Sequence, residues 1–582
     1  MTVPLTAPMT ALVARPARSA KAGEQRHALL ATQHLRLMIL MLLFVAAVTV
    51  VIGRLAWLAI EGAPARASVL GAAPRGDIVD RNGQPLARTI DAWTIGVHPD
   101  RLLGDRVAIA QKLADLMPDI GDQPYFYGLI TRNVPFTYLN RRASPALVEA
   151  VNAIGEPGIV FERETQRLYP QSTLAAHALG FLSTDGRGMG GMERALHARL
   201  TDPVQGAAPV ALSIDSRVQA AMESELGRAM AAMQAKGGAG VVLDVQTGEV
   251  IAMVSFPLFN PNRVGMAGTE ELRNNVTQSV YELGSTFKPL AMAAAIDYGV
   301  VTDMSRRFDA TVPLQVGGFT IHDDRGHEQK RWLNIPETLI YSSNIATARI
   351  ADMVGAARMQ QMFRKLGFDT KPDIELVEKA RPLWPGYWAR TTVMTTAYGH
   401  GIAVTPLHLA SAYAAMVNGG IWRPATLLRV APGHEAKGRR VLQPSTSARM
   451  RQLLRLVVLD GTGRKGDAPG YRVGGKTGTA EIAQRGGYTK NANVSTFAAA
   501  FPMDAPRYVV IAMLDSPRRV EANSFQTTAA YTVAPVVSRV ISRTGALLGI
   551  IPDDRRDIDE SDLTPLLWKA PGKRAEAGDG AE

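Results

Sequence analysis

The feature that most constrains this chain is a long apolar run near its N-terminus. Residues 37–53 carry no charged side chain, and after Arg54 the apolar character continues to residue 60. As a helix, this run would rise about 25 Å without the extension and about 36 Å with it, which brackets the roughly 30 Å hydrocarbon core of a bilayer. We therefore expect residues 37–60 to form one transmembrane helix, with Arg54 reaching the headgroups and Trp57 at the interface.

The residues before this run predict its orientation. Segment 1–36 has a basic excess, which consists of Arg15, Arg18, Lys21, Arg26 and Arg36 against Glu24. The positive-inside rule then puts residues 1–36 in the cytoplasm and everything after residue 60 outside it. The alternative is a cleaved signal peptide with Ala65-Arg66-Ala67 as its cleavage triplet, but the run is too long and the triplet too distant. No later segment is comparably apolar, so we expect a single-pass membrane protein with a large extracytoplasmic part.

Composition narrows the classes of function. The chain has 582 residues, 64 Lys and Arg, 53 Asp and Glu, a net charge of +11 and no Cys. Without Cys there can be no thiol nucleophile, Cys-ligated zinc, iron-sulfur cluster or disulfide. The basic residues beyond the membrane run occur as scattered pairs without interleaved aromatic residues, which disfavours nucleic acid as a partner. An anionic partner such as lipid headgroups or a wall polymer remains compatible with the charge.

Beyond residue 60 the sequence predicts two domains and a tail. Residues 61–205 contain short apolar runs and a hairpin-turn pair, Asn82-Gly83, typical of an irregular β-containing domain. Residues 206–551 predict an α+β domain with one antiparallel sheet, because strand patterns stand at both of its ends and helical patterns between them. Residues 552–582 mix charges with Gly, Pro and Ala, and we expect disorder there. The strands are expected at 240–253 and 473–515, and the helices at 216–236, within 284–419 and at 529–548.

Ser285 and Lys288 form the first candidate catalytic pattern. Pro289 is tolerated only in the first turn of a helix, so both residues should sit at a helix start, one turn apart on the same side. Burial and the positive helix terminus would favour a neutral Lys amine, which could take the Ser proton as a general base. A Ser-x-x-Lys pattern also arises about once by chance in a chain of this length, and Ser285 could simply cap the helix.

Ser342 and Asn344 precede a second predicted helix, at residues 345–354. Ser342 could relay a proton and Asn344 could donate to a substrate carbonyl. Alternatively, Ser343 could serve only as the N-cap, which is the better interpretation of this segment when it is taken alone.

Lys476, Thr477, Gly478 and Thr479 support two conflicting interpretations. Residues 470–477 satisfy the P-loop formula, and residues 509–515 resemble the strand and Asp that hold magnesium in nucleotide hydrolases. However, β-branched residues and glycine follow the Lys, which favours a strand over a phosphate-binding helix. Read as an edge strand, the segment could pair with an extended peptide, admit its backbone at Gly478 and bind a carboxylate through Lys476 and the Thr hydroxyls.

Two further patterns carry little weight. Gly186, Gly188 and Gly191 match the dinucleotide fingerprint in letters only, without a βαβ setting. The residues that could suggest a metal form no helix face or zinc spacing, so a polar loop is the better interpretation. They are His322, Asp323, Asp324 and His327.

Taken together, the three patterns resemble the active-site motifs of penicillin-recognising serine transferases, in the same order and with wide gaps. The apolar run and the first domain narrow the resemblance to class B penicillin-binding proteins, and it extends over residues 37–551. The further segments that carry it are 75–83, 163–170, 177–181 and 191–193 in the first domain, and 398–401 with Thr405 and Pro406 in the second. Among subtypes the chain looks most like the cell-division transpeptidase.

The resemblance implies a fold and a mechanism. The fold would be a pedestal domain followed by a transpeptidase domain, with helices on both faces of its sheet and an all-helical part. Ser285, activated by Lys288, would attack a peptidoglycan stem peptide between its terminal D-alanines, with the N–H groups of Ser285 and Thr479 as the oxyanion hole. Ser342 and Lys476 would assist proton transfer, Asn344 would orient the peptide, and Thr477 and Thr479 would bind the carboxylate. No metal or cofactor is implied.

The same resemblance implies a location in the cell inner membrane with a periplasmic catalytic domain, and it also implies partners and leaves alternatives open. β-Lactams should acylate the serine, lipid-linked precursor would supply substrate, and an FtsW-type glycosyltransferase and other division proteins would be partners. The alternatives are an elongation-specific transpeptidase, a D,D-carboxypeptidase or β-lactamase that uses water, a β-lactam sensor, and a purely structural division component.

Overall fold

The computed structural model describes residues 38–54, 75–324, 326–484 and 487–568. The chain divides into two units, Met1–Ala72 and Ala73–Glu582. In the first unit, residues 38–54 form a helix with exposed side chains. Within the described residues, no helix combines the length and the apolar character that crossing a bilayer requires. Residues 1–37 and 55–60, which belong to the predicted cytoplasmic segment and span, lie outside the description.

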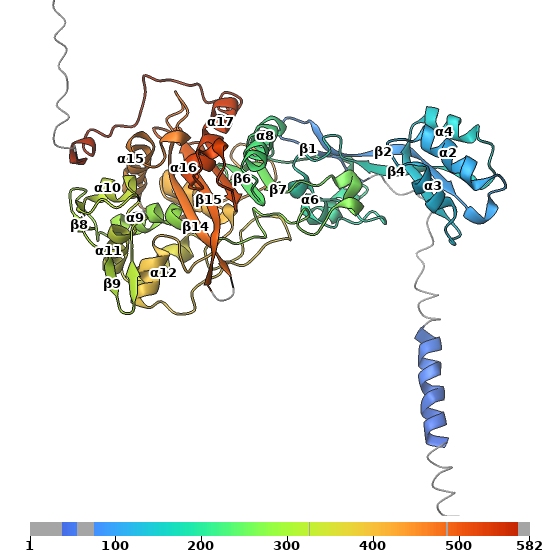
Figure 1. Ribbon diagram of the computed structural model, residues 1–582, viewed down its shortest axis with the longest axis horizontal. Coiled ribbons are helices and arrows are strands. Elements are labelled where there is room, and N and C mark those ends of the chain that lie inside the picture. The colour runs from blue at the N-terminus through green and yellow to red at the C-terminus, as the bar shows by residue number, and fades with distance from the viewer. Residues whose placement is uncertain (1–37, 55–74, 325, 485–486, 569–582) are drawn as a thin grey trace, which may run out of the picture. The chain divides into compact units, whose positions relative to one another are not determined.

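The second unit begins with a five-stranded sheet on which three helices pack (Figure 1). The strand order is β3-β2-β1-β5, and β4 also pairs with β2. The predicted turn at Asn82-Gly83 joins β1 to β2, and Gly83 adopts a φ of 84°, which a side chain would disfavour. The bounds are β1 (Ile78–Val79), β2 (Pro85–Val97), β3 (Thr137–Ala143), β4 (Ile159–Leu168), β5 (Val210–Ala211), α2 (Arg106–Leu116), α3 (Gln123–Ile130) and α4 (Pro145–Asn152).

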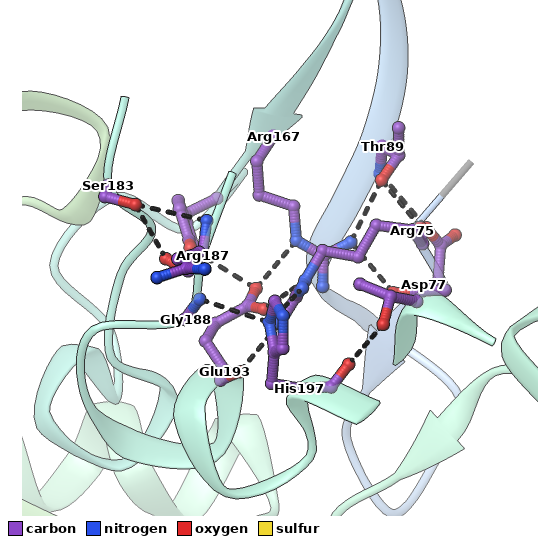
Figure 2. Close-up of polar contacts among 12 residues, drawn as sticks. Arg75, Asp77, Thr89, Arg167, Ser183, Arg187, Gly188, Glu193 and His197 are labelled. Carbon is purple, nitrogen blue, oxygen red and sulfur yellow. Dashed lines mark hydrogen bonds and ion pairs between the residues drawn. The ribbon is translucent and has the colours of Figure 1, made fainter. Parts of the chain in front are cut away.

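A buried carboxylate joins the motifs of this first domain. Arg75 Nε and Arg167 Nε donate to the two oxygens of Glu193, each over 2.7 Å (Figure 2). The Tyr169 hydroxyl donates to the same carboxylate over 3.3 Å, and Arg75 Nη1 lies 3.1 Å from Nδ1 of His197. Glu193 is fully buried, so its charge depends on these arginines, and the network fixes segments that are distant in sequence.

The second domain contains the antiparallel sheet predicted from the sequence. Its order is β14-β15-β16-β6-β7, so strands from the start of the domain pair with strands from its end. Alternate residues point to opposite faces: Val241 and Leu243 join a core with α9, α14 and α15, whereas Val242 joins a core with α8 and α17. Helices therefore cover both faces (Figure 1), as expected. The strands are β6 (Gly237–Asp244), β7 (Val250–Phe256), β14 (Gly474–Gln484), β15 (Gly487–Phe501) and β16 (Tyr508–Asp515).

Helical segments connect β7 to β14, with a few short strands among them. The helices that flank or support the sheet are α8 (Ser216–Ala232), α9 (Lys288–Asp297), α10 (Ile335–Ile340), α11 (Asn344–Val354), α14 (Pro406–Val417), α15 (Pro444–Asp460), α16 (Ala529–Thr532) and α17 (Ala534–Thr544). The remaining helices are α5 (Ala176–Leu179), α6 (Gly191–Ala195), α7 (His197–Thr201), α12 (Ala356–Lys365) and α13 (Arg390–Thr396). The short strands are β8 (Phe308–Asp309), β9 (Leu314–Val316), β10 (Phe319–Ile321), β11 (Trp332–Leu333), β12 (Ile421–Trp422) and β13 (Arg439–Arg440).

Two sequence predictions differ from this structure. The single helix expected at residues 529–548 is instead α16 followed by α17, because Pro535 stands in the first turn of α17 and cannot continue the preceding helix. The disorder expected from residue 552 is wrong for residues 552–568, which are placed against α10 and α15 and bury Leu563 completely. The charged composition of these residues suggested disorder, but several of the charges form ion pairs with the rest of the domain. Residues 569–582 lie outside the description.

Candidate active site

Ser285 lies in a tight turn immediately before α9. The sequence predicts one helix from Ser285 to Tyr298, whereas the structure has a 3-10 turn, Gly284–Phe287 (η4), and then α9. Gly284 has a φ of 55°, which lets the chain bend sharply into the turn. Ser285 is mostly buried, and only 8% of its surface is exposed. The hydroxyl thus stands at the helix start, as the sequence predicted.

Glycines bring strand β14 against this turn. A Cβ on Gly478 would lie 2.3 Å from the Leu283 carbonyl oxygen, and one on Gly284 would lie 2.8 Å from the Thr479 carbonyl oxygen. Both distances are too short for a side chain, so the two main chains approach closely only because these residues are glycines. The approach places Ser285 and Thr479, the predicted oxyanion donors, on adjoining stretches of backbone.

Lys288 is fully buried one turn after Ser285 and points to Ser342. Its ammonium nitrogen donates to Ser342 Oγ over 3.0 Å and also to the Ser342 carbonyl oxygen. Within the described part of the chain, no hydrogen bond joins Lys288 to Ser285. Catalytic hydrogen bonds are often formed only when substrate is bound, so this arrangement is compatible with Lys288 as the base for Ser285.

Ser342 is the meeting point of the site. Lys476 Nζ donates to its Oγ over 2.9 Å and to the carbonyl oxygen of Thr477 over 3.0 Å. Ser342 has a φ of 58°, in the left-handed region that non-glycine residues seldom adopt. Such strain often accompanies a functional site, and here it turns the hydroxyl toward both lysines. The structure therefore brings together one residue from each of the three motifs.

Burial weakens the charge on both lysines. Burial lowers the pKa of Lys288 to about 8, against a smaller opposing effect of Asp324 and Asp323. Burial lowers the pKa of Lys476 well below its usual range, and the charge of Lys288 lowers it further. Because two ammonium groups facing one hydroxyl repel each other, the pair favours a state with a neutral amine. A neutral amine next to a nucleophilic serine is the requirement for general-base activation.

Asn344 and Ser343 are fixed by residues 322–324, which belong to the segment predicted as a polar loop. Ser343 Oγ donates to the Asp323 carboxylate over 3.0 Å, and the Ile345 amide donates to the same group over 3.0 Å. Ser343 also caps α11, as predicted. The Asn344 side-chain amide donates to the His322 carbonyl over 2.9 Å and to the Asp324 carboxylate over 3.3 Å, so both of its N–H groups have partners in this loop.

The Lys476 segment forms an edge strand. Among the described strands, β14 pairs only with β15, and no helix begins at Lys476, so the P-loop interpretation is wrong and the edge-strand prediction is confirmed. The Thr477 hydroxyl donates to Thr462 Oγ1 over 2.8 Å. The Thr479 hydroxyl accepts from the Ala529 amide over 3.1 Å, which leaves its proton available to an anion.

Comparison with known proteins assigns the chain to a family. Residues 238–540 match the model described as "Penicillin binding protein transpeptidase domain", and residues 71–199 match the "Penicillin-binding Protein dimerisation domain". The chain belongs to the class B penicillin-binding proteins. The predicted family is thereby confirmed.

Relatives of this class B penicillin-binding protein carry a consistent description. This chain is 40% identical over 493 residues to "Probable peptidoglycan D,D-transpeptidase FtsI" of Caulobacter vibrioides, and the alignment covers 82% of each of the two chains. It is 31% identical over 476 residues to "Probable peptidoglycan D,D-transpeptidase PenA" of Neisseria gonorrhoeae, which covers 76% of this chain and 80% of the relative. A crystal structure of penicillin binding protein 3 from Mycobacterium tuberculosis, complexed with aztreonam, superposes with a TM-score of 0.65 and is 27% identical in sequence. The match covers 84% of this chain and 99% of that structure's chain. The predicted transpeptidase activity is thus confirmed.

Sequence reasoning missed three supporting residues of this penicillin-binding protein. Asp323 holds Ser343 and Ile345, Thr462 accepts from Thr477, and the Tyr413 hydroxyl donates to the Thr286 carbonyl over 2.8 Å. Asp323 belongs to a segment that the sequence predicts as a polar loop with no assigned role, and no local pattern marks Thr462 or Tyr413. Their roles depend on contacts across more than 10 residues of sequence, which spacing arguments cannot reveal.

Proposed function

We propose that this protein cross-links septal peptidoglycan through an acyl-enzyme formed on Ser285. The observation that carries the proposal is the Ser342 hydroxyl, which lies 3.0 Å from Lys288 Nζ and 2.9 Å from Lys476 Nζ in a fully buried setting. A hydroxyl shared by two lysines whose pKa values are lowered gives a path for protons from the nucleophile to the leaving group.

The first half of the reaction forms the acyl-enzyme. Neutral Lys288 takes the proton of Ser285, whose oxygen attacks the carbonyl carbon between the two terminal D-alanines. The N–H groups of Ser285 and Thr479 stabilise the oxyanion. As the C–N bond breaks, a proton returns through Ser342, assisted by Lys476, to the departing D-alanine amine.

The second half transfers the acyl group. An amine of a second stem peptide gives up its proton along the same path and attacks the ester carbon. The bond from that carbon to Ser285 Oγ breaks, the proton returns to Ser285 Oγ, and the cross-link is complete. The edge strand β14 pairs with the extended donor peptide, and Thr477 and Thr479 bind its terminal carboxylate. Asn344 orients the peptide through its side-chain oxygen. This chemistry draws only on protein groups.

The proposal extends to location and role. Residues 37–60 would form a single inner-membrane anchor, with residues 1–36 cytoplasmic and the catalytic domain periplasmic, on the basis of the apolar run and the basic excess before it. Relatives described as FtsI support a division role. The aztreonam complex of a structural relative supports β-lactams as inhibitors. Family resemblance suggests lipid-linked precursor as substrate source and an FtsW-type glycosyltransferase as partner.

Two experiments test this proposal. Purified full-length protein, mixed with lipid-linked precursor and an FtsW-type polymerase, should yield cross-linked peptides that disappear with Ser285→Ala. If only D-alanine release occurs, without cross-links, the protein is a carboxypeptidase. Depletion in cells should produce filaments, whereas rounded cells would assign it to elongation.

A further inference from the structure

Residues 552–568, which we name the C-terminal strap, cross the second domain after α17. The strap begins where the Asp553 amide donates to the Gly470 carbonyl over 2.9 Å. In Figure 1 it is the dark red segment that leaves the α17 side and reaches the side of α15 and α10. Three ion pairs join it to the rest of the domain: Arg556 with Asp504, Asp557 with Arg455, and Asp562 with Arg449.

The strap follows one face of α15. Arg449, Gln452 and Arg455 stand three residues apart and hence on one side of the helix. Arg449 pairs with Asp562 over 2.5 Å, Gln452 donates to the Asp559 carbonyl over 2.6 Å, and Arg455 pairs with Asp557 over 2.7 Å. Arg455 is itself nearly buried and also holds the Val473 carbonyl, just before β14, over 2.9 Å.

The end of the strap is anchored on α10. Leu563 is completely buried in the main core. The Asn334 side chain donates to the Leu566 carbonyl over 2.6 Å, and Glu337 accepts from the Trp568 amide over 2.9 Å. Asn334 and Glu337 are also the two partners of the capping box that starts α10, so the strap binds the groups that define this helix start.

Arg331 extends the contact to the catalytic segment. Its guanidinium lies 5.0 Å from the Trp568 ring and 5.3 Å from the Tyr341 ring, and it pairs with Glu337 over 2.9 Å. Tyr341 directly precedes Ser342. A chain of contacts therefore runs from the last strap residue to the residue next to the proton-relay serine.

The two helices that the strap holds both end at the active site. α10 ends at Ile340, two residues before Ser342. α15 ends at Asp460, two residues before Thr462, which accepts from the Thr477 hydroxyl. The Thr462 amide also donates to the Ile340 carbonyl over 3.4 Å, so the two helix ends contact each other. A six-residue helix such as α10 has little stability of its own and depends on such packing.

We infer that the C-terminal strap is a positioning element for the transpeptidase site, which sets Ser342 through α10 and Thr477 through α15. This inference rests on the proposed function. A displacement of about 1 Å in a catalytic group can lower a rate about 100-fold, so small shifts of these helix ends are sufficient for an effect. The strap thus serves the active site although none of its described residues contacts Ser285, Lys288 or Lys476 through a hydrogen bond or ion pair.

The first experiment compares full-length protein with two truncated chains, one ending at residue 551 and one at residue 568. Acylation by a fluorescent penicillin is resolved into a binding constant and a chemical rate constant. We expect the chain ending at 551 to lose on the order of tenfold or more in the chemical rate constant, and the chain ending at 568 to match the parent. A synthetic peptide of residues 552–568 should restore the lost rate. Parent-like acylation of the chain ending at 551 would overturn the inference.

A second set of variants decides the matter if the chain ending at 551 does not fold. Asp557→Asn with Asp562→Asn removes two ion pairs to α15, and the control Asp554→Asn makes the same chemical change at an exposed strap position that has no ion pair among the described residues. The double variant should lower the chemical rate constant of acylation severalfold, with folding checked by circular dichroism, while the control stays at the parent value. Equal kinetics in the folded double variant and the control would overturn the inference. If the parent itself is not acylated, the proposed function fails instead.

Discussion

The pH dependence of acylation offers the sharpest test of how Lys288 activates Ser285. Only the neutral amine can accept the serine proton, so the acylation rate should follow the neutral fraction of Lys288. With a pKa of about 8, caused first by burial, that fraction is about one-tenth at pH 7 and about nine-tenths at pH 9. The rate should therefore rise about tenfold across this interval and then level off. An ordinary lysine with a pKa of about 10.4 would instead give a rise of nearly 100-fold without a plateau.

The assay is stopped-flow or quenched labelling with a fluorescent penicillin from pH 6 to 10, on full-length protein. Asp324→Asn supplies a second arm, because the Asp324 carboxylate opposes the fall of the Lys288 pKa. Its removal should move the midpoint below that of the parent. Asp554→Asn is the matched control, since Asp554 is exposed on the strap. A flat profile, or one that still rises steeply at pH 10, would refute the assignment of Lys288 as the base.

Three further predictions concern stability and the shape of the site. Glu193→Ala should lower the free energy of unfolding by about 3–5 kcal/mol in urea titrations, because it leaves two buried arginine charges unpaired; a loss below about 1 kcal/mol would contradict this. Burial lowers the pKa of His177 to about 4, so its contribution to stability is present above pH 6.5 and falls, by at most about 3 kcal/mol, as the unfolded state takes up the proton on acidification. In His177→Gln, the free energy of unfolding, measured by urea titration, should depend less on pH between 7.5 and 5 than in the parent. An unchanged slope would contradict this prediction. Gly478→Ala should abolish penicillin labelling while β14 stays paired, because its Cβ would lie 2.3 Å from the Leu283 carbonyl oxygen; full labelling would show that the close approach is not needed.

Local sequence patterns predicted the parts of the fold whose causes are local. The turn at Asn82-Gly83, the paired strands β6 and β7, and the helix after Ser343 follow from turn, strand and capping chemistry within a few residues. The edge-strand interpretation of Lys476 held because the β-branched residues after it disfavour a helix. The prediction that Ser285 is the nucleophile rested on the occurrence of three motifs in a fixed order, because no single motif was specific enough.

Other features depend on partners far away in the chain. No local sequence pattern near residue 552 indicates that Asp557 and Asp562 form ion pairs with arginines of α15. Without those partners, the charged composition predicts disorder. The N–H groups of Asn344 donate to the His322 carbonyl and the Asp324 carboxylate, 22 and 20 residues earlier, and no local spacing indicates these partners. Similarly, the sequence places the Ser285 hydroxyl within reach of the Lys288 amine, whereas in the structure both Lys288 and Lys476 donate to Ser342 Oγ.

The most direct test of the nucleophile is to locate the covalent adduct. Full-length protein is treated with benzylpenicillin, digested and analysed by mass spectrometry, in parallel with Ser285→Ala. The account predicts the penicilloyl mass on the peptide that contains Ser285 and no adduct in the variant. An adduct on another residue, or one that persists in Ser285→Ala, would contradict the central claim.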